Sequence, residues 1–277
     1  MGNFDKLSMT DKSVRGRMQE RGGAMTAMGK RERLELLKAA RYAHRGLHQK
    51  PQIAENSMTA FRRAVLNGYG IELDVHLTAD GKLAVLHDSS LKRTCGIDLE
   101  IEKITLKKAQ SFPLEAGNDR IPEFDEVLDL VDGMVPLIIE LKTAGKNHRQ
   151  LTDRVMEVLS GYRGSYCVES FNPAVVRYLK QRYPDVVRGQ LAGALNKEKK
   201  TLSTWEDFLL KNLLVNLAGK PDFVAYRFQD RQERVFRRFK GAKFSWTITS
   251  YEDMKICEEM GVTPIFEQFD PKDYERS

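Results

Sequence analysis

The strongest constraint on the fold is an alternation of strand-like and helix-like segments that runs from Arg41 towards the C-terminus. Many of the intervening segments have helical periodicity, such as SMTAFRRAVLNG, which has a cap at Asn56 or Ser57 and a stop at Gly68. This alternation predicts parallel strands in one α/β domain, arranged either as an open sheet or as a closed barrel. The strand candidates are RYAHRG, GIELDV, KLAVLHD, VPLIIELK, YCVESF, VVRGQLAG, PDFVAY, KFSWTIT and TPIFEQ.

We interpret the pattern as an α/β TIM (β/α)8 barrel in a single domain, for which nine strand candidates are one too many. PDFVAY or TPIFEQ is the segment that we expect to be surplus. The connection from GIELDV to KLAVLHD is too short for a crossover helix. We therefore expect an irregular short connection between strands 2 and 3.

The ends of the chain and one internal stretch differ from this pattern. Residues 1–25 are polar and basic, which predicts a flexible N-terminal arm before a barrel domain at 26–277 that opens on a helix in KRERLELLKAARYA. Residues 197–220 are long and amphipathic. We interpret their leucines as core residues, with peripheral contact to lipid or to a partner as the alternative.

Composition narrows the choice of partners. The net charge is +6, but the basic residues are spread along the chain without a nucleic-acid-binding motif. We therefore expect no nucleic-acid partner, whereas a modest positive field suits a small anionic substrate. Cys95, Cys167 and Cys257 are far apart and odd in number, which argues against disulfides and a zinc site. Because the chain has no transmembrane segment and no secretory signal, we expect a cytoplasmic protein.

Two strand candidates carry acidic side chains on one face near their C-terminal ends. Alternation in GIELDV puts Glu72 and Asp74 on one face and apolar residues on the other. Glu140 and Lys142 alternate in the same way in PLIIELK. Buried like charges need a cation, and carboxylate oxygens favour Mg²⁺ or Ca²⁺. The pattern predicts one divalent cation at the C-terminal mouth of a barrel, although a solvated acidic edge would explain either motif alone.

Histidines in similar positions indicate acid–base chemistry. His44 ends the first strand candidate and His87 ends another, in AVLHD. Imidazole titrates near neutral pH, so two imidazoles beside one cation predict a general acid and a general base. Arg45 and Lys142 are suited to binding phosphate oxygens. The other histidines, His48, His148 and His76, are expected to be solvent-exposed. For His76, which alternation puts on the same face as Asp74, a supporting role behind Asp74 is the alternative.

Together these motifs resemble the glycerophosphodiester phosphodiesterase family. The similarity runs from about Tyr42 to Thr249 and is carried by AHRG, AENSMTAFRRAV, GIELDVHLTADGKLAVLHDSSLKRTCG, RIPEFDEVLDLV, PLIIELK, VESFNPAVVRYLK and SWTIT. The order HRG, E-x-D, HD and E-x-K is specific to it. The resemblance implies a TIM barrel of the phospholipase C-like type and metal-dependent hydrolysis of glycerophosphodiesters to glycerol 3-phosphate and an alcohol.

The resemblance also implies a role for each matching residue. His44 and His87 match the general acid and base. Arg45 and Lys142 match phosphate contacts, and Trp246 matches a tryptophan on the glycerol side of the substrate. The remaining matches are Glu55, which would orient Arg45 or a histidine, and the metal ligands Glu72, Asp74 and Glu140.

Departures from the family pattern keep other functions open. Ser57 stands where threonine is usual, and Glu267 with Gln268 replaces the usual Thr-Asp after the last strand, which affects the expected substrate preference. A lysophospholipase D with the same site is the first alternative, and an apolar groove at the mouth would mark it. A metal-dependent sugar isomerase would not need Arg45 and Lys142, and a non-catalytic phosphate-binding barrel would need no catalytic histidines.

Overall fold

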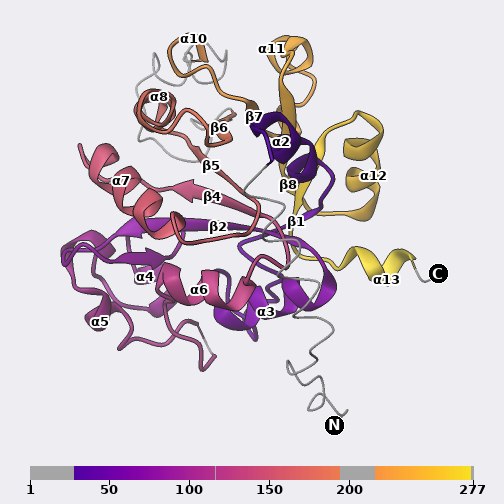
Figure 1. Cartoon of the computed structure of the whole chain (residues 1–277). Coiled ribbons are helices and arrows are strands. Elements are labelled where there is room, and N and C mark those ends of the chain that lie inside the picture. Colours follow the sequence, from indigo (N-terminus) through magenta and orange to yellow (C-terminus); the bar gives the residue numbers. More distant parts are fainter. Residues whose placement is uncertain (1–27, 116, 194–215, 276–277) are drawn as a thin grey trace.

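The computed structural model describes residues 28–115, 117–193 and 216–275. Eight parallel strands form a closed barrel with helices around it (Figure 1). Their order around the barrel is β1 (Tyr42–His44), β2 (Gly70–Leu77), β4 (Leu137–Leu141), β5 (Tyr166–Ser170), β6 (Arg188–Ala192), β7 (Phe223–Arg227), β8 (Ala242–Ile248) and β9 (Thr263–Phe266), which pairs with β1. The predicted TIM barrel is confirmed.

The surplus strand is not the one that we expected. PDFVAY and TPIFEQ lie at the barrel strands β7 and β9, whereas KLAVLHD contains β3 (Leu83–Val85), which pairs with β2 and is antiparallel to it. The reason is the short connection, a tight turn in which the Gly81 N–H donates to the Thr78 carbonyl and the Thr78 N–H donates to the Lys82 carbonyl. A connection of this length joins antiparallel strands and not parallel ones.

The outer core lies between the strands and the surrounding helices. The apolar face of β2 packs there, as alternation predicts, because Ile71, Leu73 and Val75 are buried in the same cluster as Phe61 and Val127. The helices on this side are α3 (Met58–Asn67), α6 (Phe124–Val131), α7 (His148–Leu159), α8 (Pro173–Arg182), α11 (Arg234–Arg238) and α12 (Tyr251–Glu259).

Helix α3 begins and ends where the sequence indicates. The Ser57 side chain accepts a hydrogen bond from the Ala60 N–H, and Gly68 ends the helix in the left-handed conformation. Of the two candidate caps, Ser57 is therefore the one that caps the helix. Asn56 instead donates a side-chain hydrogen bond to Asp74 at 2.8 Å, which links this helix start to the barrel interior.

The inner core fills the N-terminal half of the barrel and is closed by α2 (Lys30–Lys38). Leu37 of α2 is fully buried in the same cluster as Ile138, Cys167 and Phe223. The Tyr42 hydroxyl donates to the Leu37 carbonyl at 2.8 Å and fixes the helix to β1. This apolar plug leaves the C-terminal mouth as the open end.

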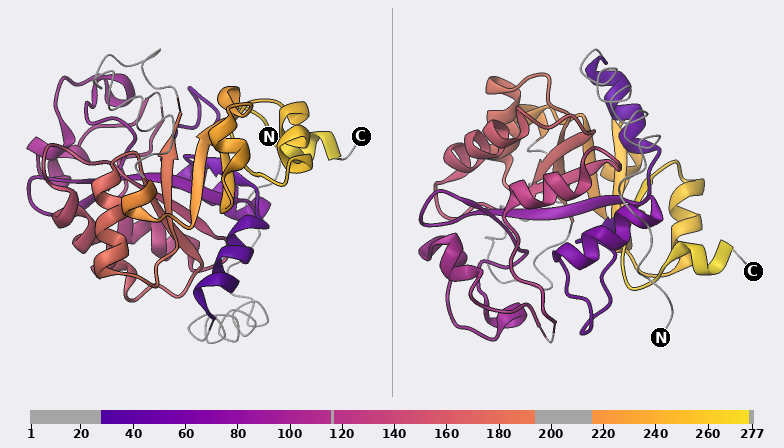
Figure 2. Two further views of the ribbon diagram at one scale, coloured as in Figure 1. Left: turned by 90° about the horizontal axis from the view of Figure 1, so that it is seen from above. Right: turned by 60° about the horizontal axis from the view of Figure 1, so that its bottom comes forward.

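A smaller apolar cluster supports the segment between β3 and β4. It contains Leu86, Leu91, Ile101, Leu106 and Ile121, all buried. The segment includes α4 (Lys92–Cys95), η1 (Ile101–Lys103) and α5 (Leu106–Ala109), which lie together beside the barrel (Figures 1 and 2).

The remaining elements are short: α10 (Asn216–Gly219), η3 (Phe228–Asp230) and α13 (Pro271–Glu275). The arm predicted at 1–25 lies outside the described residues, as does most of the stretch 197–220. Among the described residues, every helix is too short or too polar to cross a membrane.

Candidate active site

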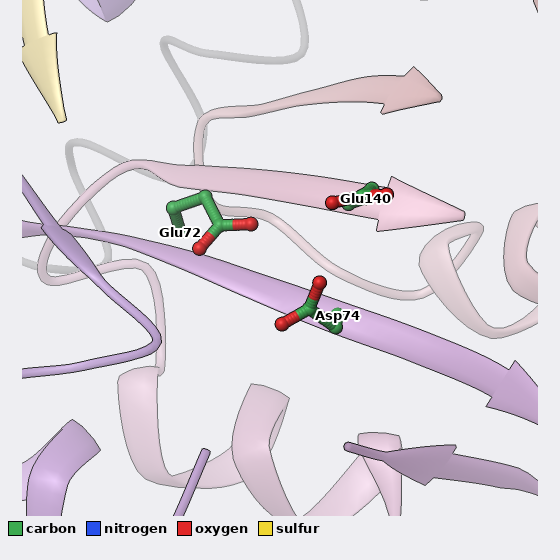
Figure 3. A group of neighbouring side chains, drawn as sticks. All are labelled: Glu72, Asp74 and Glu140. Carbon is green, nitrogen blue, oxygen red and sulfur yellow. The ribbon is translucent and has the colours of Figure 1, made fainter. Parts of the chain in front are cut away.

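Three carboxylates from two adjacent strands meet inside the barrel, near its C-terminal end (Figure 3). Glu72 and Asp74 belong to β2, and Glu140 belongs to β4 in register with Asp74. All three side chains are buried, and one oxygen from each lies within 4.8 Å of the others. We call these residues the carboxylate trio. They are the residues that we predicted as metal ligands.

Two basic side chains lie against the carboxylate trio. Lys142 Nζ is 3.2 Å from Asp74 Oδ1 and 2.9 Å from Glu140 Oε1. Arg45 Nε is 3.5 Å from Asp74 Oδ2, and the Arg45 backbone N–H donates to Glu72 Oε2 at 3.1 Å. Burial opposes ionisation of Lys142, but the charges of Glu140 and Asp74 outweigh it and raise its pKa. With all three carboxylates ionised, the two positive charges leave one negative charge uncompensated.

The electrostatics of the carboxylate trio fit a divalent cation. Burial, followed by the charges of Asp74 and Glu140, raises the pKa of Glu72 well above its ordinary value. Burial acts in the same direction on Asp74, but nearby positive charges, with Lys142 first, hold the pKa of Asp74 well below its ordinary value. Asp74 Oδ1 lies 3.2 Å from Lys142 Nζ but accepts no well-aligned hydrogen bond among the described residues. A hard cation would compensate the excess charge and occupy this oxygen.

His44 lies at the end of β1 between two carboxylates. Its Nδ1 is 2.7 Å from Glu267 Oε2, and its Nε2 is 3.8 Å from Glu72 Oε2. A carboxylate beside Nδ1 favours the tautomer with its proton on that atom, which leaves a lone pair on Nε2 towards the carboxylate trio. Burial, followed by the charge of Arg45, lowers the pKa of His44. The lowered pKa favours the neutral imidazole, whose Nε2 lone pair can accept a proton.

His87 reaches the same site from outside the barrel. We expected it at the end of a barrel strand, but it follows β3, which runs back along β2 so that the Leu86 N–H donates to the Asp74 carbonyl at 3.0 Å. The His87 Nδ1 lies 2.6 Å from Asp88 Oδ1. Burial is the main reason why the pKa of His87 falls to about 4. Both histidines thus have Nδ1 held by a carboxylate.

A charged cluster around Glu55 fixes the side chain of Arg45. Glu55 Oε1 accepts hydrogen bonds from Arg45 Nη1 at 3.0 Å and from Arg93 Nη2 at 2.5 Å, and Lys50 pairs with the other oxygen. Burial opposes ionisation of Glu55, but these three cations outweigh it and lower its pKa. Arg93 also pairs with Asp88 at 2.5 Å. It therefore connects Glu55, which holds Arg45, to Asp88, which holds His87. Glu55 therefore makes the contact that orienting Arg45 requires.

Trp246 lies in β8, in the wall of the barrel. Its indole N–H donates to the Ala225 carbonyl at 3.2 Å, and its ring meets Phe171 edge-on with centroids 5.6 Å apart. These two contacts fix the orientation of the indole.

Two histidines that we expected at the surface have buried side chains. The His48 side chain is 6% exposed, with Nε2 3.6 Å from Glu267 Oε2. His76 is 3% exposed and its Nδ1 is 2.7 Å from Glu102 Oε1. These expectations are wrong because Glu267 follows a strand beside β1 and η1 packs against β2, contacts between segments distant in sequence. His148 begins α7 and is half-buried against Tyr178.

Sequence reasoning missed three acids at the site. Glu267 stood out only as a departure from a family pattern, and Asp88 only as part of the His-Asp pair. Glu169 was not considered, although it occupies the strand end next to Glu140 and alternates with Val168, which belongs to the outer core. The signal was the same alternation that identified Glu72 and Asp74.

Comparison with known proteins identifies the family. The sequence profile of the glycerophosphoryl diester phosphodiesterase family matches residues 44–269. The chain belongs to this family. A glycerophosphodiester phosphodiesterase of Bacillus altitudinis is 37% identical over 131 residues, which is 44% of this chain and 53% of that protein. One from Caldanaerobacter subterraneus subsp. tengcongensis is 32% identical over 161 residues, 54% of this chain and 65% of that protein.

The chain therefore spans less than two thirds of the length of these two relatives of the glycerophosphoryl diester phosphodiesterase family. Among solved structures, an Oleispira antarctica phosphodiesterase in complex with the product sn-glycerol-3-phosphate is similar with a TM-score of 0.69 and 20% identity. The similarity covers 85% of this chain and 95% of that one. This similarity shows that the two chains share the barrel fold. The profile match confirms the family that the sequence motifs predicted.

Proposed function

We propose that the chain is a metal-dependent phosphodiesterase that hydrolyses glycerophosphodiesters to glycerol 3-phosphate and an alcohol. The observation that carries the proposal is the pair of histidines beside the carboxylate trio, each with Nδ1 held by a carboxylate. The basic side chains of Arg45 and Lys142 lie against the same trio. Membership of the glycerophosphoryl diester phosphodiesterase family supports the same reaction.

The phosphate would bind over the carboxylate trio. Glu72, Asp74 and Glu140 would hold one divalent cation, either Mg²⁺ or Ca²⁺. Such a cation, when bound, supplies positive charge that stabilises the negative charge developing on the phosphoryl oxygens.

The side chains around the trio would orient the substrate. Arg45, which Glu55 holds in place, offers a planar fork to the phosphate oxygens, and Lys142 adds a second positive charge. Trp246, fixed by its indole hydrogen bond, would contact the glycerol end of the substrate.

His44 and His87 would carry out the two proton transfers. One neutral imidazole would take the proton of the attacking hydroxyl at Nε2, whether that hydroxyl is water or the substrate's own glycerol hydroxyl, and in the second case water would then open the cyclic phosphate. The other imidazole would first take up a proton at Nε2 beside the anionic phosphate and then give it to the oxygen of the departing alcohol. Because a carboxylate occupies Nδ1 of each ring, Nε2 is the atom that exchanges the proton. Glu267 would keep the His44 ring in one orientation throughout the cycle, and Asp88 would do the same for the His87 ring.

A product assay tests the proposal. The purified chain would be incubated with glycerophosphocholine or with lysophosphatidylcholine, each with Mg²⁺, Ca²⁺ or EDTA. Release of glycerol 3-phosphate and choline from the first compound, abolished by EDTA, is the expected result. Choline released only from the lysolipid would assign lysophospholipase D activity instead. No product from either compound, or from diesters with other head groups, would contradict the proposal.

Histidine variants connect the reaction to the site. His44→Ala and His87→Ala are each expected to reduce kcat by about 10²-fold or more, because each removes a proton-transfer group. Cation binding should be largely retained. His148→Ala is the matched control, since this histidine lies on α7 against Tyr178. Full activity in either site variant would remove that histidine from the mechanism.

A further inference from the structure

Glu169 is a buried acid that the proposed mechanism does not use. It lies in β5, in register with Glu140 of β4. Cys167, two residues earlier, belongs to the inner core cluster, so strand alternation points Glu169 into the barrel interior as well. Glu169 is only 1% exposed.

The carboxylate of Glu169 is poorly compensated. Its Oε2 atom is buried and has no hydrogen-bond partner in the described part of the chain. Lys142 acts on it electrostatically but is in contact with Asp74 and Glu140 instead. Burying a carboxyl group without a partner opposes folding. By contrast, the equally buried Glu55 pairs with three cations.

The charges that act on Glu169 come from the carboxylate trio. Burial, then Glu140 and Asp74, raise its pKa, and the charge of Glu169 in turn raises the pKa of Glu72. Register with Glu140 and the inward face of β5 place the carboxyl group of Glu169 on the β5 side of the trio, outside the three oxygens that lie within 4.8 Å of one another. A bound cation at the trio would compensate the buried carboxyl group of Glu169, which otherwise opposes folding.

We propose that Glu169 is a fourth carboxylate of the cation site and makes that site prefer Ca²⁺ to Mg²⁺. The inference rests on the proposed function only in that the carboxylate trio holds a divalent cation. Ca²⁺ takes about six to eight oxygen ligands in flexible geometry. Mg²⁺ is smaller, keeps several water ligands and usually binds about one or two carboxylates. A fourth anionic group, on a third strand, therefore favours the larger ion.

Cation binding tests the inference without using activity. The full chain would be freed of metal with EDTA, exchanged into buffer and titrated by calorimetry with CaCl2 and, separately, MgCl2. The wild-type chain should bind Ca²⁺ more tightly. Glu169→Gln should weaken Ca²⁺ binding by about 10- to 100-fold and Mg²⁺ binding by less than about threefold. The control is Glu102→Gln, which removes a carboxylate paired with His76 and should change neither affinity.

The outcomes separate this inference from the proposed function. If the wild-type chain binds neither ion, the proposed cation and this inference both fail. If the wild-type chain binds Ca²⁺ and Glu169→Gln binds Ca²⁺ equally well, only the inference fails. The same holds if Glu169→Gln loses affinity for Ca²⁺ and Mg²⁺ to the same extent. Thermal unfolding gives a second readout. Glu169→Gln should unfold at the same or a higher temperature in EDTA and gain less from Ca²⁺, whereas a lower midpoint in EDTA would contradict the inference.

Discussion

At the scale of single residues, the site uses one arrangement twice, with a carboxylate on Nδ1 of each catalytic histidine candidate. The partner of His87 is the next residue, Asp88, so the sequence alone contains that pair. The partner of His44 is Glu267, 223 positions away. It comes close only because β9 pairs with β1 and closes the barrel. Sequence motifs could therefore identify the histidines but not both of their supports.

Glu267 is predicted to position His44 for proton transfer. Glu267→Ala removes the acceptor at Nδ1, so the ring loses its fixed orientation and tautomer. We expect kcat to fall by about 10²-fold and KM to change by less than about threefold, because proton transfer is affected more than binding. Glu267→Asp should recover part of the loss. Steady-state kinetics with glycerophosphocholine would measure both constants.

The control for this variant is Asp270→Asn, in the same segment after β9. Asp270 accepts a hydrogen bond from the Tyr69 hydroxyl at 2.6 Å, away from His44. If it lowered kcat as much as Glu267→Ala, the effect would come from displacement of the segment. Unchanged kcat in Glu267→Ala would also contradict the positioning role.

His87 is predicted to make the stability of the metal-free chain depend on pH. Burial lowers its pKa from the ordinary 6.5 to about 4 in the folded chain. Between these values the unfolded chain binds more protons, so stability is greatest above pH 6.5 and falls as the pH decreases towards 4. From pH 7 to pH 5 this group alone should lower the free energy of unfolding by about 2 kcal/mol.

Urea denaturation in EDTA at pH 7 and at pH 5 would measure this difference. His87→Gln should show a smaller loss between the two pH values than the wild-type chain. His148→Gln, a substitution outside the site, should show the same loss as wild type. If the loss in His87→Gln were undiminished, His87 would not be a buried neutral group.

At the scale of elements, the site depends on turns that the barrel pattern alone does not predict. The hairpin from β2 to β3 reverses the chain and brings His87 back beside Asp74, which a regular crossover helix would not do. The turn after β1 has both Arg45 and Gly46 at positive φ, and the Gly46 N–H donates to the Ala43 carbonyl at 3.1 Å. Strand alternation predicted which face Glu72 and Asp74 occupy, but not where the hairpin would place a histidine.

Gly46 is predicted to be required for its turn. It has a φ of 80°, and a Cβ atom there would lie 2.9 Å from the Ala60 backbone carbon. Gly46→Ala therefore adds steric overlap with α3 to backbone strain, and should lower the free energy of unfolding by about 3 kcal/mol. Gly81→Ala is the matched control. Its φ is 74° with no atom within 4 Å of the added Cβ, so only strain of about 1 kcal/mol is expected.

Urea unfolding of the two glycine variants would measure the difference. Equal losses would show that α3 moves aside without cost. In that case, close packing against α3 would not explain why glycine follows His44 and Arg45.

At the scale of the whole molecule, alternation predicted parallel strands covered by helices, as an open sheet or as a closed barrel, because each helix must cover an apolar strand face. It could not decide which of nine segments lies outside the ring, since a three-residue antiparallel strand has the same apolar character as a barrel strand. The closing contacts, β9 with β1 and η1 with β2, join distant segments. They determine which histidines are buried, which is why the expected exposure of His48 and His76 was wrong.

The closed barrel also separates the residues that stabilise it from those that would act on substrate. Leu37 of α2 is fully buried at the N-terminal end, whereas its neighbour Leu36 is 45% exposed. Leu37→Ala should lower the free energy of unfolding by about 2–5 kcal/mol, because it leaves a cavity in the inner core. Leu36→Ala, the same chemical change on the same helix, should change it by less than about 0.5 kcal/mol.

Both leucine variants, assayed well below their unfolding temperatures, should retain the wild-type kcat and KM on glycerophosphocholine. The reason is that α2 closes the end of the barrel opposite the carboxylate trio, so the loss of packing there leaves the mouth in place. Chemical denaturation and steady-state kinetics on the same preparations would measure the two properties together. A folded Leu37→Ala chain with a large loss of kcat would show that the two ends are coupled, and would contradict this division of the molecule.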